Sequence, residues 1–76
     1  MELYFDKTFV RKITLGTTAY LVEQNAYKQS ITITHKSSGN IIYKYTSHDK
    51  SVEYEPESVG FIKEIFKEAH IQRYLL

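Results

Sequence analysis

Strict alternation of apolar and polar residues marks the middle of the chain. In residues 30–36, Ile31 and Ile33 alternate with serine and threonine positions. Successive side chains of a strand point to opposite faces, so a period of two predicts a half-buried β-strand. Similar runs follow at 41–47 and 51–55, and we expect all three to form an antiparallel meander.

The turn between the first two of these strands sets their register. With Gly39 in the left-handed position of a three-residue loop, Ile33 pairs with Tyr43. A two-residue loop would pair Ile33 with Lys44, so we favour the longer loop. An even-length loop within residues 47–50 then keeps the next strand in phase and turns its glutamates outward. The apolar face predicted in this way comprises Ile31, Ile33, Ile41, Tyr43, Tyr45, Val52 and Tyr54.

The first third of the chain is rich in β-branched and aromatic residues but alternates less cleanly. Runs at 8–15 and 18–24 are separated by a Gly-Thr pair at 16–17, which suits a type II′ hairpin turn. In such a hairpin Val10 and Leu21 would face away from the other apolar side chains. These strands are therefore either apolar on both sides or interrupted by a bulge.

A helix is predicted after Pro56, which cannot donate to a sheet and suits the first turn of a helix. We expect it over residues 57–70. Beyond His70 the apolar pattern breaks, so residues 71–76 either fold back as a tail or continue the helix with apolar groups exposed. At about 100° per residue, one side of this helix carries Val59, Phe61, Ile62, Ile65, Phe66 and Ala69.

These elements together predict one α+β domain over residues 1–76, an antiparallel β-meander of four to five strands with a C-terminal amphipathic helix on one sheet face. A chain of 76 residues has too small a core for a deep cavity, and it could gain buried surface as a homodimer. No apolar run approaches the roughly 18 residues of a membrane span, and residues 1–7 do not resemble a signal peptide. We expect a cytoplasmic, non-membrane protein.

Residue types that carry chemistry are sparse. There is no cysteine, which excludes a disulfide, a thiolate zinc site and a cysteine nucleophile. His35, His48 and His70 do not have metal-ligand spacing, and the Ser-Ser-Gly-Asn turn at 37–40 lacks the flanking glycines of a serine nucleophile motif. Glu53, Glu55 and Glu57 alternate, as expected for charges that protect a sheet edge. We therefore expect no catalytic residue, metal, cofactor or small-molecule substrate.

Charge is unevenly distributed along the chain. Residues 1–50 carry seven Lys and Arg against four Asp and Glu, whereas residues 51–76 carry three against five. Basic residues interleaved with aromatic ones can hold a single nucleic-acid strand on a sheet. The alternative function is therefore weak, sequence-tolerant binding of single-stranded nucleic acid on the helix-free sheet face, through Lys12, Lys36 and Lys44 with Arg11, Lys28 and Tyr27.

Several apolar and tyrosine residues near the two ends find no place in the predicted core. Tyrosine brings contact area at a low entropy cost and is enriched in interfaces. The leading hypothesis is therefore a non-enzymatic protein-binding or regulatory module, inhibitor-like, of the kind found on phages and other mobile elements. Its partner would be another protein or a second copy of the chain. Candidate contacts are an exposed edge within residues 3–15 and the side chains of Tyr4, Phe5, Ile71, Tyr74, Leu75 and Leu76.

Overall fold

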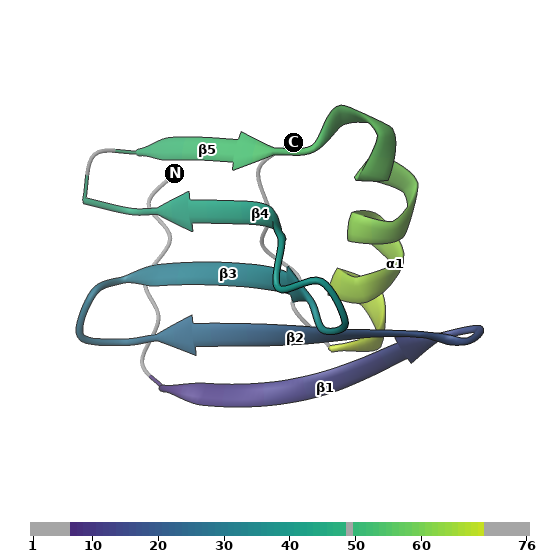
Figure 1. Cartoon of the computed structure of the whole chain (residues 1–76). Coiled ribbons are helices and arrows are strands. Elements are labelled where there is room, and N and C mark those ends of the chain that lie inside the picture. The colour runs from purple at the N-terminus through teal and green to yellow at the C-terminus, as the bar shows by residue number, and fades with distance from the viewer. Residues whose placement is uncertain (1–6, 49, 70–76) are drawn as a thin grey trace.

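The computed structural model describes residues 7–48 and 50–69 as a five-stranded antiparallel sheet with one helix (Figure 1). The strands follow one another in chain order, which confirms the α+β meander. Each strand end lies within one residue of its predicted position. The elements are β1 (Phe9–Leu15), β2 (Thr18–Asn25), β3 (Ser30–His35), β4 (Ile41–Thr46), β5 (Ser51–Tyr54), a 3₁₀ helix (Pro56–Ser58) and α1 (Val59–Glu68).

The central strands pair as predicted, although the β3–β4 loop has four residues, 36–39, instead of the predicted three. Ile33 lies opposite Tyr43, and Tyr43 lies opposite Tyr54. The first hairpin is regular as well, with a two-residue turn in which Gly16 has a φ of 63° and Thr17 does not have a positive φ. That combination fits a type II′ turn and excludes type I′, which needs two positive φ angles. The β1–β2 ladder contains no bulge.

A bulge in β4 changes which of two neighbouring isoleucines faces the core. Ile33 pairs with Tyr43 but Thr34 pairs with Ile41, so Ile42 is the extra residue of the bulge. The extra residue changes the side-chain parity, which turns Ile42 into the core and Ile41 out of it. Ile42 is 3% exposed, whereas Ile41 is 56% exposed. The prediction that Ile41 faces the core was wrong.

One hydrophobic core lies between the sheet and α1. Its best-defined contact is between Tyr43 and Phe66, whose rings meet edge to face with centroids 5.0 Å apart. Phe9, Leu15 and Val52 pack around its margin. The buried members are Ile13, Tyr20, Val22, Ile31, Ile33, Ile42, Tyr43, Tyr45, Ile62, Ile65, Phe66 and Ala69.

Two further residues expected in the core are exposed. Tyr54 pairs with buried Tyr43 but belongs to β5, at the edge of the sheet, where no described strand covers its other side. It is 43% exposed. Phe61 precedes buried Ile62 and lies at the margin of the apolar stripe, where it is 53% exposed. The helix therefore buries a narrower stripe than the periodicity predicts.

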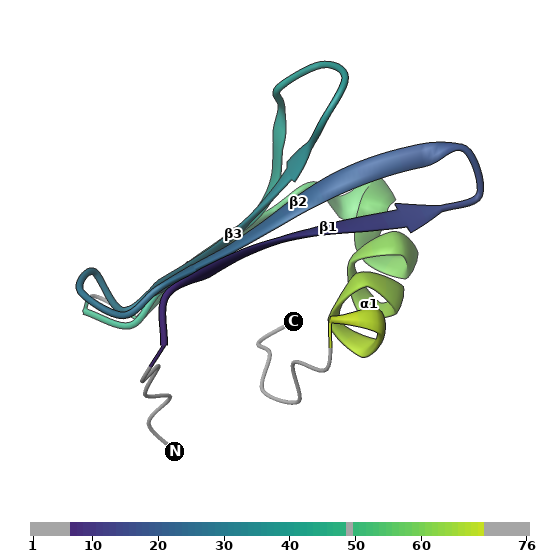
Figure 2. The same cartoon turned by 90° about the horizontal axis from the view of Figure 1, so that it is seen from below.

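The helix crosses one face of the sheet, and nothing in the described residues covers the opposite face (Figure 2). The Arg11 guanidinium donates a hydrogen bond of 2.7 Å from Nη1 to the carbonyl oxygen of Ala69, which links β1 to the end of α1.

Pro56 starts a 3₁₀ turn, so α1 begins at Val59 rather than near residue 57. No helix in residues 7–48 and 50–69 is both long and apolar enough to cross a bilayer.

Candidate functional site

The sheet face opposite α1, called the helix-free face below, is mainly polar. The ladder registers and strand alternation place on it every second side chain of each strand, except at the β4 bulge, where Ile42 and Tyr43 both face the core. Two apolar side chains on it are strongly exposed, Val10 at 62% and Ile41 at 56%. Its polar side chains include Lys12, Glu23, Thr32, Thr34, Lys44 and Glu53.

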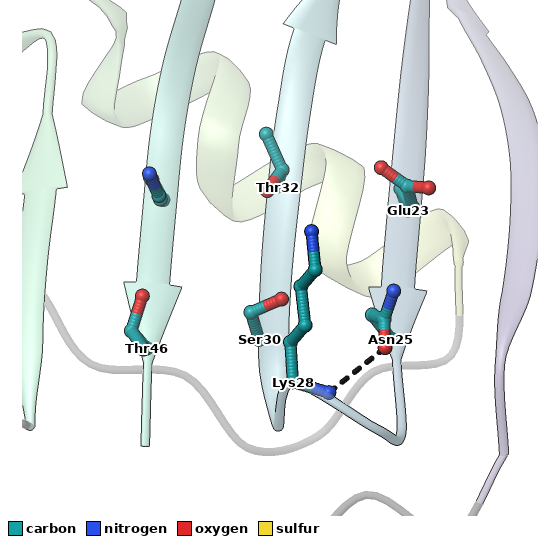
Figure 3. Close-up of a pocket in the computed structure, with 7 residues that line it drawn as sticks. Glu23, Asn25, Lys28, Ser30, Thr32 and Thr46 are labelled. Atoms are coloured by element: carbon teal, nitrogen blue, oxygen red, sulfur yellow. Dashed lines mark hydrogen bonds between the residues drawn. The ribbon is translucent and has the colours of Figure 1, made fainter. Parts of the chain in front are cut away.

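A polar depression of about 370 Å³ lies on this face at the end of the sheet near the β2–β3 turn (Figure 3). Lys28 extends from that turn toward Thr32, and its backbone N–H donates to Asn25 Oδ1 over 2.9 Å. The lining residues are Glu23, Asn25, Lys28, Ser30, Thr32, Lys44 and Thr46. Hydroxyls, an amide and charges of both signs line the depression, so it can bind polar groups but not an apolar ligand.

Charges of opposite sign are interleaved across the helix-free face. In one cross-strand row Glu23 lies opposite Thr32, Thr32 opposite Lys44, and Lys44 opposite Glu53. Directly opposite partners lie about 4.5–5.5 Å apart at Cβ, close enough for the charges to offset one another. The face is therefore not a continuous cationic platform of the kind that tracks a phosphate backbone.

The residues predicted to bind nucleic acid do not form one surface. Lys12, Lys28 and Lys44 lie on or beside the helix-free face, and exposed Lys36 follows β3 and lines a different depression. Arg11 alternates with Lys12 along β1 and lies on the opposite, helix-covered face.

Within residues 7–48 and 50–69, the interior of the helix-free face carries no aromatic side chain, but exposed Tyr54 lines a depression at its β5 margin together with Ile41, Lys44 and Glu53. Tyr27 is 95% exposed, but it lies in the β2–β3 turn. Tyr20 of β2 is buried in the core. A base stacked on this face would therefore have to use Tyr54 at the β5 margin, where the neighbouring Glu53 and Glu55 carry negative charge.

The partner-binding prediction concerns side chains near the two ends of the chain. Tyr4, Phe5, Ile71, Tyr74, Leu75 and Leu76 all lie outside the described residues. Of the predicted edge within residues 3–15, the structure describes residues 7–15, which include all of β1.

The alternation of hydrogen bonds along β2 shows which of its residues bond to β3 and which bond to β1. The Lys36 N–H donates to the Ala19 carbonyl over 3.0 Å, so Ala19 and every second residue after it in β2 face β3. The intervening residues, among them Tyr20 and Val22, therefore bond to β1. Their partners in the ladder are Ile13 and Arg11.

The outer edge of β1 consequently carries backbone groups that pair with no strand among the described residues. Because Arg11 and Ile13 bond to β2, the N–H and C=O of Val10, Lys12 and Thr14 point away from the sheet. No strand among the described residues lies beyond β1. These three residues are called the β1 edge below. The sequence predicted an exposed edge within residues 3–15, and the register of β1 against β2 shows which of its residues point their backbone groups outward.

The opposite edge of the sheet is shorter and acidic. The Glu55 N–H donates to the Ile42 carbonyl over 3.0 Å, so only Val52 and Tyr54 of β5 point their backbone groups outward. The strand has four residues and is followed by Pro56, which has no N–H to offer. Such an edge is poorly suited to pairing with another strand.

One histidine lies beside two hydroxyls in the β3–β4 hairpin. Ser37 Oγ and Ser38 Oγ lie 3.1 and 3.2 Å from His35 Nδ1, and the Tyr20 ring meets the imidazole edge to face at 5.5 Å. A serine beside a histidine resembles a catalytic nucleophile and its general base, but catalysis also needs a third group that orients the histidine. The recorded polar contacts of His35 are to these two serines and the hairpin backbone, so the contacts shape the turn.

Within the described ranges, 7–48 and 50–69, no group of three or more acidic, histidine or cysteine residues could hold a metal ion.

A comparison with known protein families found no match, and neither did searches of curated proteins and of solved structures. The candidate site therefore rests on the geometry of the helix-free face and the β1 edge.

Proposed function

We propose that this chain is a small non-enzymatic binding module that engages another protein through the helix-free face and the β1 edge. The β1 edge is the observation that carries the proposal, because its outward backbone groups pair with no strand in residues 7–48 and 50–69 and lie beside the exposed Val10 side chain. Open strand edges and exposed apolar groups are features through which proteins pair with one another. Occupation of a partner by so small a module would make it a regulator or inhibitor, the role that small proteins of phages and mobile elements fill.

Binding of single-stranded nucleic acid is the competing proposal for the same face. Its support is the presence of Lys12, Lys28 and Lys44 on one side of the sheet. Glu23 and Glu53, interleaved with these lysines, would repel phosphates and weaken such binding. Protein binding therefore agrees better with the charges.

A cytoplasmic location belongs to the same proposal and is supported by the absence of cysteine.

A photo-crosslinking amino acid in place of Thr14 tests the proposal, because this side chain lies on the helix-free face at the β1 edge. The matched control carries the same group in place of Lys63, which is exposed on α1. Irradiation in cells that naturally produce the chain is expected to give a discrete protein adduct from position 14 and none from position 63.

Three outcomes decide between the proposals. A protein adduct that depends on position 14 supports the binding module. Adducts to nucleic acid at position 14 would favour the competing proposal. Equal labelling from both positions, or none from position 14, would contradict protein binding through this part of the sheet.

A further inference from the structure

The β1 edge has the backbone geometry to accept one more strand. It offers three N–H and three C=O groups, from Val10, Lys12 and Thr14, along a strand of seven residues. An extended peptide that pairs with such an edge gains affinity from backbone hydrogen bonds and specificity from alternating side chains. The side chains that flank the edge therefore define the peptide that fits.

The charges beside this edge are all positive. Between Lys7 and Leu15 the chain contains Lys7, Arg11 and Lys12 and no acidic residue. Arg11 and Lys12 are consecutive, so they project to opposite faces of the sheet. Both remain exposed, although Arg11 also bonds to the Ala69 carbonyl.

An added strand would meet these two cations with two adjacent residues, one on each face. Pairs of opposite charge directly across a sheet are favourable, and like pairs are unfavourable. The complementary strand therefore carries two consecutive acidic residues, one opposite Arg11 and one opposite Lys12. β-Branched or other apolar residues would flank this acidic pair, opposite Val10 and Ile13.

Neither edge strand of a second copy of this chain would supply the complementary acidic strand. Two copies of β1 paired antiparallel in full overlap would place Lys12 opposite Lys12. Glu53 of β5 and Glu55, which follows the strand, are separated by Tyr54, so both point to one face and cannot meet both cations. A second copy is thus disfavoured as the occupant.

We propose, as an extension of the proposed function, that the partner protein contributes an extended acidic segment which pairs with β1 as a sixth strand. Lys12 is central to the pairing, because its N–H and C=O point outward and its side chain carries a charge on the helix-free face. The two adjacent acidic residues give the segment its register, and its backbone binds the three outward N–H and C=O pairs of the β1 edge.

A peptide titration of the full chain, followed through its backbone amide resonances by NMR, tests this pairing. The probe is a short peptide of threonine and valine with two adjacent glutamates at its centre, and the matched probe carries two lysines instead. The glutamate peptide is expected to shift the amides of Val10, Lys12 and Thr14. The lysine peptide should bind about tenfold more weakly, which corresponds to about 1.4 kcal/mol.

Reversing the charge at residue 12 distinguishes strand pairing from nonspecific binding of the peptide. Lys12→Glu should lose affinity for the glutamate peptide and gain affinity for the lysine peptide, whereas Lys63→Glu, an equal change of charge on exposed α1, should bind like the unmodified chain. Lys12→Pro should abolish binding of both peptides, because it removes an outward N–H that takes no part in the β1–β2 ladder.

Several results would overturn the proposed pairing. The first is the absence of amide shifts at the β1 edge at millimolar glutamate peptide, and the second is a response confined to Thr32 and Lys44. A free protein that sediments as a dimer with the Lys12 amide already protected would assign the edge to a second copy. If position 14 still crosslinks a protein while the charge exchange has no effect, the strand pairing fails and the proposed function survives. Loss of the crosslink itself would remove both.

Discussion

Replacement of Phe66 by alanine is expected to destabilise the fold by about 3–5 kcal/mol, the cost of a cavity left by a buried aromatic ring. Phe66 is 2% exposed and its ring packs against Tyr43. Domains have roughly 0.05–0.15 kcal/mol of stability per residue, so the loss would be comparable with the whole stability of 76 residues. Urea denaturation followed by circular dichroism measures it.

Phe61→Ala is the matched control, because it removes the same ring from the same helix at a position that is 53% exposed. Its effect should stay within about 1 kcal/mol, since surface substitutions seldom cost more. Equal losses from the two variants would show that α1 does not present the Ile62, Ile65 and Phe66 side to the sheet.

The β4 bulge leads to the second large effect. Ile42→Ala is expected to cost about 2–5 kcal/mol, whereas Ile41→Ala should change stability by no more than about 0.5 kcal/mol. The two residues are chemically identical neighbours, but Ile42 is 3% and Ile41 56% exposed. The free energy of unfolding in urea distinguishes them directly. A larger loss at Ile41 would mean that β4 continues without the bulge, as the alternation alone had predicted.

Much of the sheet could be predicted because its information is local. Ile31 and Ile33 alternate with hydroxyl residues, and Gly39 has the expected left-handed φ of 78°. The predicted three-residue loop was wrong, however, because closure of His35 on Asn40 leaves four residues, and the bulge at Ile42 is what places Tyr43 opposite Ile33. A shift by one residue would expose this whole apolar set, so the pattern specifies the register strongly. The same reasoning located the hairpin turn at Gly16.

The bulge could not be predicted because the sequence provides two isoleucines in succession. Either Ile41 or Ile42 satisfies an apolar position, and local propensity does not distinguish them. The choice depends on how the β3–β4 hairpin closes, with the Gly39 N–H bonded to the His35 carbonyl and the His35 N–H bonded to the Asn40 carbonyl. Such contacts are properties of the folded hairpin.

The candidate site was predictable only in part for a related reason. Lys36 and Lys44 were assigned to one helix-free face from alternation; the structure places Lys44 there, whereas Lys36 follows β3 and lines a different depression. Arg11 was grouped with them, although it lies on the other face and bonds to Ala69, 58 residues away. Long-range contacts of this kind follow from the arrangement of the entire chain.

Amide hydrogen exchange of the free protein, read residue by residue along β1, tests the open β1 edge most directly. Arg11 and Ile13, which bond to β2, should exchange slowly. Val10, Lys12 and Thr14 should exchange at rates near those of an unstructured peptide. Equal protection of all five amides would contradict the open edge, because it would show that this side of the sheet is already paired.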